Sequence, residues 1–295
     1  MTLLLMMLTS INAWAAVIWT GDGSQESPYQ IDTYEKLKEF AAMVNDVNNS
    51  RSYAWAILTA DILCTDNTWT PIGQSTSYYR YTGTFDGRGY TITGLSNTGV
   101  DPAPSNAGLF GYVGSSGIVQ NVILADATLI GSQFIGGIAG YNNGGTIQNS
   151  CLIGTSSISS TYSSSYGTGG NGGIVGFNRG TVAGCYVAIS GSGSISDTGG
   201  DKSIGGIIGT NVGTLENCHY SGSGAISTSF TSVNLNLGGV VGNNTGSASY
   251  CYYAGTGAIS GSDNIGPIIG SNSATVTSCY YNTSNTTLTD RKSVV

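Results

Sequence analysis

From residue 108 onward, short apolar segments rich in Ile and Val alternate with turns rich in glycine and asparagine, and one phrase returns in every unit. The phrase reads G-G-I/V-hydrophobic-G-x-N, and its copies begin at Gly108, Gly136, Gly172, Gly205, Gly238 and Gly266. Successive copies start 28, 36, 33, 33 and 28 residues apart, which is the length of one supersecondary unit in a repeat protein. Three short β-prone segments fit into each unit, so the pattern predicts one coil of an all-β solenoid per repeat.

An asparagine closes the phrase in five of the units. In stacked parallel strands, equivalent residues lie about 4.8 Å apart, so like side chains form columns along the stack. The sequence therefore predicts an asparagine ladder at one corner of the coil, because asparagine tolerates the left-handed turn conformation and its amide can bond to the amides above and below. Its members are Asn142, Asn178, Asn211, Asn244 and Asn272, and Val113 takes the same place in the first unit.

Five of the six cysteines also recur once per unit, while Cys64 stands apart. The expected thiol column consists of Cys151, Cys185, Cys218, Cys251 and Cys279. A disulfide between adjacent rungs would need two parallel side chains to turn toward each other, and zinc would need paired cysteines or more than one histidine. We therefore expect buried free thiols that act as small apolar residues, with no metal and no cofactor. An inward Cys185 requires a left-handed bend at Gly184, and Asn217 has the same place before Cys218.

Inward cysteines would turn the next residue of each unit outward, in a row formed by Tyr186, His219, Tyr252 and Tyr280. Aromatic rings in such a row can hold sugar rings or an extended peptide by stacking, so these four residues are the candidate binding site. Ordinary packing between neighbouring rungs explains the same row, and both interpretations stay open.

The chain before the repeats has a different pattern. Residues 33–47 place Leu37, Phe40, Ala41 and Val44 on one face of an amphipathic helix. The open end of a parallel β-helix would otherwise promote edge-to-edge aggregation, so we expect this helix to cap the first coil. Residues 16–107 are thus assigned to an N-terminal cap with the first coils.

The first residues resemble an export signal. An apolar run from Leu3 to Leu8 precedes Ala13 and Ala15, the small residues of an A-x-A cleavage site. We expect a signal peptide at residues 1–15 that directs the protein to the cell surface or the extracellular space. No later run approaches the roughly 18 apolar residues of a membrane-spanning helix, so the mature chain is expected to have no transmembrane segment.

Composition narrows the choice of partners. Charged residues make up only 8% of the chain, nine residues are basic and the net charge is −7, so the basic stripe of a nucleic-acid-binding protein is missing. Glycine accounts for 46 residues and tyrosine for 18, while 40% of the residues are hydrophobic, which favours a packed fold over disorder.

The order of the motifs resembles bacterial surface proteins that carry GLUG repeats. GDGSQESPYQIDTYEKLKEFAAMVN is followed by ADIL, WTPIG, GTFDGRGYTITGL, GLFGYV and repeated GGIVGFN-like phrases, and together these cover nearly all of the chain after the leader. The resemblance implies a right-handed parallel β-helix on a secreted or cell-surface protein, usually described as adhesin-like. Similar repeats flank the catalytic part of immunoglobulin-A-cleaving metallopeptidases, but the zinc signature H-E-x-x-H needs two histidines and this chain has only His219. We assign residues 108–284 to the repeats and 285–295 to a tail, and expect the chain to be part of a longer surface protein.

Two functional classes follow. The first is a non-catalytic, adhesin-like protein that binds glycans or the surface proteins of a host or neighbouring cell. The alternative is a carbohydrate-active β-helix enzyme, a polysaccharide lyase or glycoside hydrolase, with its site in the loops at residues 154–171 and 190–203.

Glycoside hydrolysis commonly needs two carboxylates about 5–10 Å apart. The acidic residues of the repeats are scattered over different positions, namely Asp126, Asp197, Asp201, Glu216 and Asp263. Asp86 in TFDGRG is expected to form a turn with Arg88 as a solvated neighbour, so no residue is assigned a catalytic role.

Overall fold

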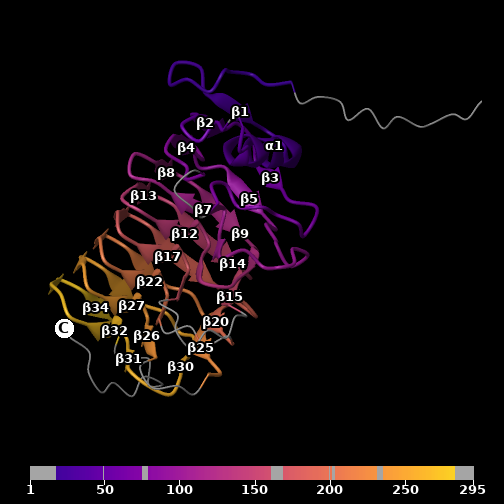
Figure 1. Cartoon of the computed structure of the whole chain (residues 1–295). Helices are drawn as coiled ribbons and strands as arrows, with labels where there is room; N and C mark the ends of the chain where they lie inside the picture. Colours follow the sequence, from indigo (N-terminus) through magenta and orange to yellow (C-terminus); the bar gives the residue numbers. More distant parts are fainter. Residues whose placement is uncertain are drawn as a thin grey trace, which may run out of the picture.

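The protein is a parallel β-solenoid, and its computed structural model describes residues 18–48, 50–74, 79–160, 169–198, 200, 203–230 and 235–282. Figure 1 shows the rungs stacked in chain order, from the indigo N-terminal helix to the yellow last rung. All the strand pairs between rungs are parallel, as predicted for a β-helix. The expected leader at residues 1–15 and the tail at residues 285–295 lie outside the described residues.

Five parallel sheets, named A to E, run along the stack. Sheet A contains β1 (Tyr29–Ile31), β2 (Ala56–Leu58), β4 (Thr84–Asp86), β8 (Ile118–Gln120), β13 (Thr146–Gln148), β18 (Thr181–Ala183), β23 (Thr214–Glu216), β28 (Ser247–Ser249) and β33 (Val276–Thr277). Sheet B contains β3 (Ile62–Leu63), β5 (Thr91–Thr93), β9 (Ile123–Ala125), β14 (Cys151–Gly154), β19 (Tyr186–Ile189), β24 (His219–Tyr220), β29 (Tyr252–Tyr253) and β34 (Tyr280–Tyr281).

The other three sheets complete each coil. Sheet C contains β7 (Phe110–Val113), β12 (Ala139–Asn142), β17 (Val175–Asn178), β22 (Ile208–Asn211), β27 (Val241–Asn244) and β32 (Ile269–Asn272). Sheet D contains β10 (Thr128–Gly131), β15 (Ser157–Ser160), β20 (Ser194–Asp197), β25 (Ala225–Thr228) and β30 (Ile259–Ser260). Sheet E contains β6 (Asn106–Ala107), β11 (Phe134–Gly136), β16 (Gly170–Gly172), β21 (Ser203–Gly205), β26 (Asn236–Gly238) and β31 (Ile265–Gly266). In each repeat the chain passes through E, C, A, B and D in that order.

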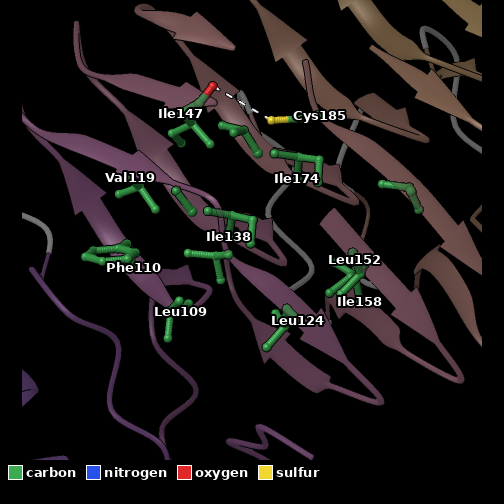
Figure 2. Close-up of a cluster of buried hydrophobic side chains, with 14 of the residues drawn as sticks. Leu109, Phe110, Val119, Leu124, Ile138, Ile147, Leu152, Ile158, Ile174 and Cys185 are labelled. Carbon is green, nitrogen blue, oxygen red and sulfur yellow. Dashed lines mark hydrogen bonds between the residues drawn. The ribbon is translucent and has the colours of Figure 1, made fainter. Parts of the chain in front are cut away.

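The core is made of inward-pointing aliphatic residues that repeat from rung to rung. In sheet A, Val119, Ile147 and Val182 are partners in register, and all three are fully buried. Figure 2 shows side chains from several rungs meeting inside the coil, with the Cys185 sulfur directed at the carbonyl oxygen of Ile147. Each such side chain contributes roughly 1.5–3 kcal/mol when removed from water, and the contribution recurs on every rung.

The paired glycines of the repeated phrase form the corner between sheets E and C. A Cβ atom on Gly136 would lie 2.3 Å from the carbonyl oxygen of Ala139, and one on Gly238 would lie 1.9 Å from that of Val241. Both distances are far inside van der Waals contact. The corner is therefore so tight that only glycine fits at the first position of the phrase, where every copy has it, whereas the second position is Leu109 in the first copy and Pro267 in the last.

Left-handed residues form the corner between sheets A and B. This position is occupied by Asn121, Asn149, Gly184, Asn217, Tyr250 and Ser278, whose φ angles range from 49° to 62°. The predicted bend at Gly184 and Asn217 is confirmed. It turns the next residue, Cys185 or Cys218, into the core, where both are fully buried.

The predicted asparagine column lies at the corner after sheet C, and its members are partners in register. The Asn142 amide donates to the Asn178 Oδ1 atom at 2.8 Å, and the same bond recurs from Asn178 to Asn211 at 2.9 Å and from Asn211 to Asn244 at 2.8 Å. Asn244 continues the series to Asn272 at 2.8 Å. None of the five asparagines has a positive φ, so the left-handed turn expected at this position is wrong. The amides satisfy one another from rung to rung, except that the Oδ1 atom of the first member, Asn142, has no partner among the described residues.

The helix α1 (Tyr34–Asn45) covers the first coil. The Thr33 hydroxyl accepts a hydrogen bond from the Lys36 amide at 3.2 Å and caps the helix N-terminus. Phe40 is fully buried, and its ring centroid lies 6.0 Å from that of Tyr81 and 6.1 Å from that of Phe85. The helix thus packs on the rings that fill the first coils. Within the described ranges no helix is long and apolar enough to span a bilayer.

Candidate functional site

The four candidate binding residues lie in one row on the outer side of sheet B. Tyr186 pairs with His219, His219 with Tyr252, and Tyr252 with Tyr280. The rings of Tyr186 and His219 are 5.3 Å apart at an interplanar angle of 8°, and those of His219 and Tyr252 are 4.5 Å apart at 4°. These residues, Tyr186, His219, Tyr252 and Tyr280, form the aromatic column.

Stacking within the column covers both faces of His219 and one face each of Tyr186 and Tyr252. His219 lies between two tyrosines, so neither of its faces is open to a ligand, and burial lowers its pKa, which favours the neutral ring. Exposure is concentrated at the C-terminal end of the row, where 43% of Tyr252 and 65% of Tyr280 is accessible. Tyr250 lies beside Tyr252 at the A–B corner and is 61% exposed. We call Tyr250, Tyr252 and Tyr280 the tyrosine patch.

The prediction that Cys151 belongs to the thiol column was wrong. Cys151 pairs with Tyr186 and thus takes the aromatic position of its rung, while Ser150 precedes it where Cys185 precedes Tyr186. Cys151 lies 15 residues after the first glycine of its phrase, whereas the other four cysteines of the repeats lie 13 residues after theirs. Only one of the two additional residues is an insertion, in the turn before β13, where three residues separate Asn142 from Thr146 and two separate Asn178 from Thr181. The extra residue shifts every later position of that rung by one.

The remaining thiols, Cys185, Cys218, Cys251 and Cys279, stack inside the A–B corner. All six cysteines of the chain are free and buried. The Cys185 amide donates to the Cys218 sulfur at 3.3 Å, and the Cys218 thiol donates to the carbonyl oxygen of Glu216 at 3.2 Å. Burial raises the pKa of Cys218 well above its ordinary value, so this thiol stays protonated and unreactive at neutral pH.

A shallow concavity of about 590 Å³ lies at the other end of the aromatic column. It is lined by Asp86, Arg88, Gly89, Asn121, Ile123, Asn149, Cys151 and Tyr186. Its raised wall comes from the connection between β4 and β5, which has four residues where later rungs have two. We call this site the Tyr186 concavity.

Asp86 is held at the edge of the Tyr186 concavity by hydrogen bonds. Its carboxylate accepts from Asn121 Nδ2 at 2.9 Å, from Gln120 Nε2 at 3.0 Å and from the Arg88 amide at 2.8 Å. Partial burial raises the pKa of Asp86, but these hydrogen bonds outweigh it, and the pKa is lowered overall. Arg88 has a φ of 51°, so the expected turn around Asp86 is present.

The other acidic candidates lie on different parts of the coil. Asp86 and Glu216 share one row of sheet A but are four rungs, or about 19 Å, apart. Asp126 accepts hydrogen bonds from Thr155 at a turn, while Asp197 is buried and accepts from Ser160. Asp201 lies outside the described residues, as do parts of both loops proposed for the alternative enzyme site.

Sequence reasoning missed a second stack of rings, on sheet C. Tyr112 and Tyr141 are 4.9 Å apart at 1°, and Tyr141 and Phe177 are 5.0 Å apart at 14°. Phe134 packs edge-on against Phe177 at 5.0 Å, and the Arg179 guanidinium lies 5.5 Å from the Phe177 ring. A sequence signal could have revealed this stack: in three successive repeats, the residue just before the last position of the phrase is aromatic, namely Tyr112, Tyr141 and Phe177. In the described part of the chain, no three His, Cys, Asp or Glu side chains are grouped to hold a metal.

The parallel strands, glycine corners and stacked columns define a parallel β-solenoid of the glycine-rich repeat type. Among solved structures, a crystal structure described as a "putative immunoglobulin A1 protease" from Bacteroides ovatus shares this fold, with a TM-score of 0.65 over 92% of this chain and 82% of that chain. The two sequences are 20% identical, so the likeness concerns the fold alone.

Two curated proteins are related in sequence, while no family model matches the chain. Halomucin of Haloquadratum walsbyi is 35% identical over 150 residues, covering 47% of this chain and 2% of halomucin. A "Putative Gly-rich membrane protein" of Evansella cellulosilytica is 31% identical over 137 residues, covering 46% of this chain and 15% of that protein. The matches thus span a small part of the length of both relatives.

Proposed function

We propose that this protein is an exported, non-catalytic surface protein of the GLUG-repeat type, which attaches to glycans or surface proteins of a host or neighbouring cell. The observation that carries the proposal is the tyrosine patch on the last rungs of sheet B. Three large amphipathic side chains are 43–65% exposed there, side by side on a rigid scaffold. Tyrosine is favoured at recognition surfaces because it offers a large contact area and a hydroxyl group at little cost in side-chain entropy.

The relatives support a location outside the cell. Halomucin is by its name a mucin-type protein, and the second relative is named as a membrane protein. A β-solenoid presents long, flat sheets that extended partners can follow, which suits attachment better than enclosure of a small substrate. The proposed leader at residues 1–15 fits the same location.

The arrangement of carboxylates weighs against the alternative enzyme. A glycoside hydrolase would bring two carboxyl groups within about 10 Å, and one of them would have a raised pKa to act as an acid. Asp86 has a lowered pKa and its nearest partner in the same row, Glu216, is about 19 Å away. This supports binding without catalysis.

The test is a binding screen of the purified protein on arrays of glycans and extracellular matrix proteins. We expect the double variant Tyr252→Ala/Tyr280→Ala to lose most of the signal that the native protein gives. Tyr53→Ala is the matched control, because Tyr53 is 60% exposed but lies outside the patch. Circular dichroism and the thermal midpoint of each variant verify that the coil is intact.

Two outcomes would contradict the proposal. Equal binding by the native protein and the double variant would remove the tyrosine patch from the attachment surface. Release of new reducing ends from a polysaccharide in the same samples would replace binding with the enzyme alternative.

A further inference from the structure

We propose that the Tyr186 concavity binds one uncharged pyranose unit of a glycan, with Tyr186 as its aromatic wall and Asp86, Arg88 and Asn149 as its hydrogen-bonding groups. The inference rests on the proposed glycan-binding role and assigns to it a specific site and a class of sugar. This site lies at the opposite end of the aromatic column from the tyrosine patch, so the two can be tested separately.

The position of Tyr186 in its column leaves one ring face without an aromatic neighbour. His219 covers the face toward the C-terminal rungs at 5.3 Å. On the other side the register partner is Cys151, followed by Ile123, and neither carries a ring. The column of rings therefore ends at Tyr186, and the space that a further ring would occupy opens into the concavity.

Small apolar groups form the floor below this ring. Cys151 is 2% exposed, and its neutral thiol lies beside the Tyr186 hydroxyl, a contact that raises the pKa of Tyr186 to about 12. Ile123 extends the apolar surface by one rung. The C–H faces of a pyranose ring match such a surface, because the negative face of an aromatic ring attracts the weakly positive C–H groups.

Polar groups surround the apolar floor with both donors and acceptors. Two amides, Asn121 and Asn149, and the Arg88 guanidinium line the concavity. The Asp86 Oδ2 atom accepts one hydrogen bond, from Gln120, and can accept another. A sugar hydroxyl donates and accepts at once, so adjacent hydroxyls of a pyranose match a carboxylate beside a guanidinium.

The charges of the site favour an uncharged ligand. Arg88 forms no ion pair within 4 Å in the described part of the chain, and its single positive charge is balanced by Asp86 in the same wall. An acidic sugar would meet the Asp86 carboxylate, and an amino sugar would meet the Arg88 guanidinium. The volume of about 590 Å³ lies in the usual range of small-molecule sites, roughly 300–1,000 Å³. Because the concavity is shallow, binding of a single unit will be weak.

Saturation-transfer difference NMR of the whole chain detects weak binding of this kind. The probes are the methyl glycosides of glucose, galactose, mannose and N-acetylglucosamine, with methyl glucuronide as the charged comparison. We expect saturation transfer to at least one uncharged glycoside, and transfer at least about tenfold weaker to the glucuronide.

Variants assign the signal to the concavity. Tyr186→Leu removes the ring, and Arg88→Asn removes the guanidinium while keeping a residue that tolerates a positive φ. Each should reduce the transfer at least about tenfold. Tyr186→Phe keeps the ring and should retain most of the transfer, and Tyr53→Ala should change nothing. Arg88→Asn also keeps the test decisive if Tyr186→Leu lowers the stability.

Several results would overturn the inference: no transfer to any uncharged glycoside, preference for the glucuronide, or unchanged transfer in both Tyr186→Leu and Arg88→Asn. The proposed function fails separately, when Tyr252→Ala/Tyr280→Ala attaches as well as the native protein. Attachment that depends on Tyr252 and Tyr280, without any transfer to the glycosides, would leave the proposed function standing and remove the Tyr186 site.

Discussion

Single residues at the corner between sheets A and B differ in how well they suit its left-handed conformation. Asn149, Gly184 and Asn217 suit it, because glycine and asparagine adopt positive φ at little cost. Tyr250 and Ser278 adopt φ of 54° and 53° at the equivalent position, where other residue types lose about 1–2 kcal/mol. The repeats therefore keep the geometry of this corner even where the residue type opposes it.

We predict that Tyr250→Asn stabilises the protein by about 1 kcal/mol, because asparagine relieves the backbone strain at this position. Urea unfolding followed by circular dichroism measures the change. Asn217→Ala makes the opposite change at the equivalent position, replacing a residue that suits a positive φ by one that does not, and should destabilise the protein by a similar amount. A loss of stability in Tyr250→Asn would mean that contacts of the tyrosine ring outweigh the strain.

The sequence was informative for single residues where a residue type is tied to one backbone geometry. Gly184 and Asn217 marked the left-handed corner. The closing asparagine of the phrase marked its column through side-chain hydrogen bonds alone, because none of the five asparagines has a positive φ. Cys151 was misassigned because one cysteine per repeat suggested a single column, although Cys151 lies two positions further along its repeat than the others: one is an inserted turn residue, and the other moves it to the aromatic position. The Tyr186 concavity was not predicted, since it depends on a wider turn, four residues long, that lies three rungs before Tyr186.

At the scale of elements, the asparagine ladder joins consecutive rungs that are otherwise held by backbone pairing and apolar contact. Each interior asparagine both donates to the next member and accepts from the previous one. Loss of an interior member such as Asn211 therefore leaves the Asn244 Oδ1 atom without its donor and the Ser247 carbonyl oxygen without its side-chain donor, while Asn178 keeps its bonds to two backbone carbonyls.

We predict that Asn211→Ala lowers the free energy of unfolding by about 3 kcal/mol, the sum of two buried groups left without their partners. Asn243→Ala provides the matched control, because Asn243 lies on the neighbouring strand β27 and points outward, and its loss should cost less than about 0.5 kcal/mol. Chemical denaturation of both variants gives the comparison. Equal effects would show that the ladder contributes no more than a surface amide.

Across the whole molecule, the connections between sheets differ in whether their length is constant or varies from coil to coil. The corner between sheets E and C has two residues in every rung, for example between β26 and β27. The connection between sheets D and E varies, from two residues between β10 and β11 to nine between β15 and β16. Differences in repeat length, from 28 to 36 residues, are therefore absorbed largely on one side of the solenoid.

We predict that four residues, Gly-Ser-Gly-Ser, can be inserted between Gly261 and Ser262 at little cost. The insertion doubles a four-residue connection between β30 and β31, which costs about 0.6 kcal/mol in loop entropy. The same insertion between Gly239 and Val240, in the tight corner between sheets E and C, should prevent folding of the coil. Thermal unfolding of the two proteins checks the contrast, and similar midpoints would contradict it.

The stacking of one repeat per rung determines how far this protein can reach. A repeat of 33 residues lengthens the stack by only about 4.8 Å, whereas the same residues in an extended chain would span about 110 Å. The nine strands of sheet A accordingly measure about 38 Å from first to last. Added repeats therefore increase the length of the stack very little. Each one instead enlarges the lateral sheet surfaces, where its outward side chains lie at a fixed spacing from those of the previous repeat.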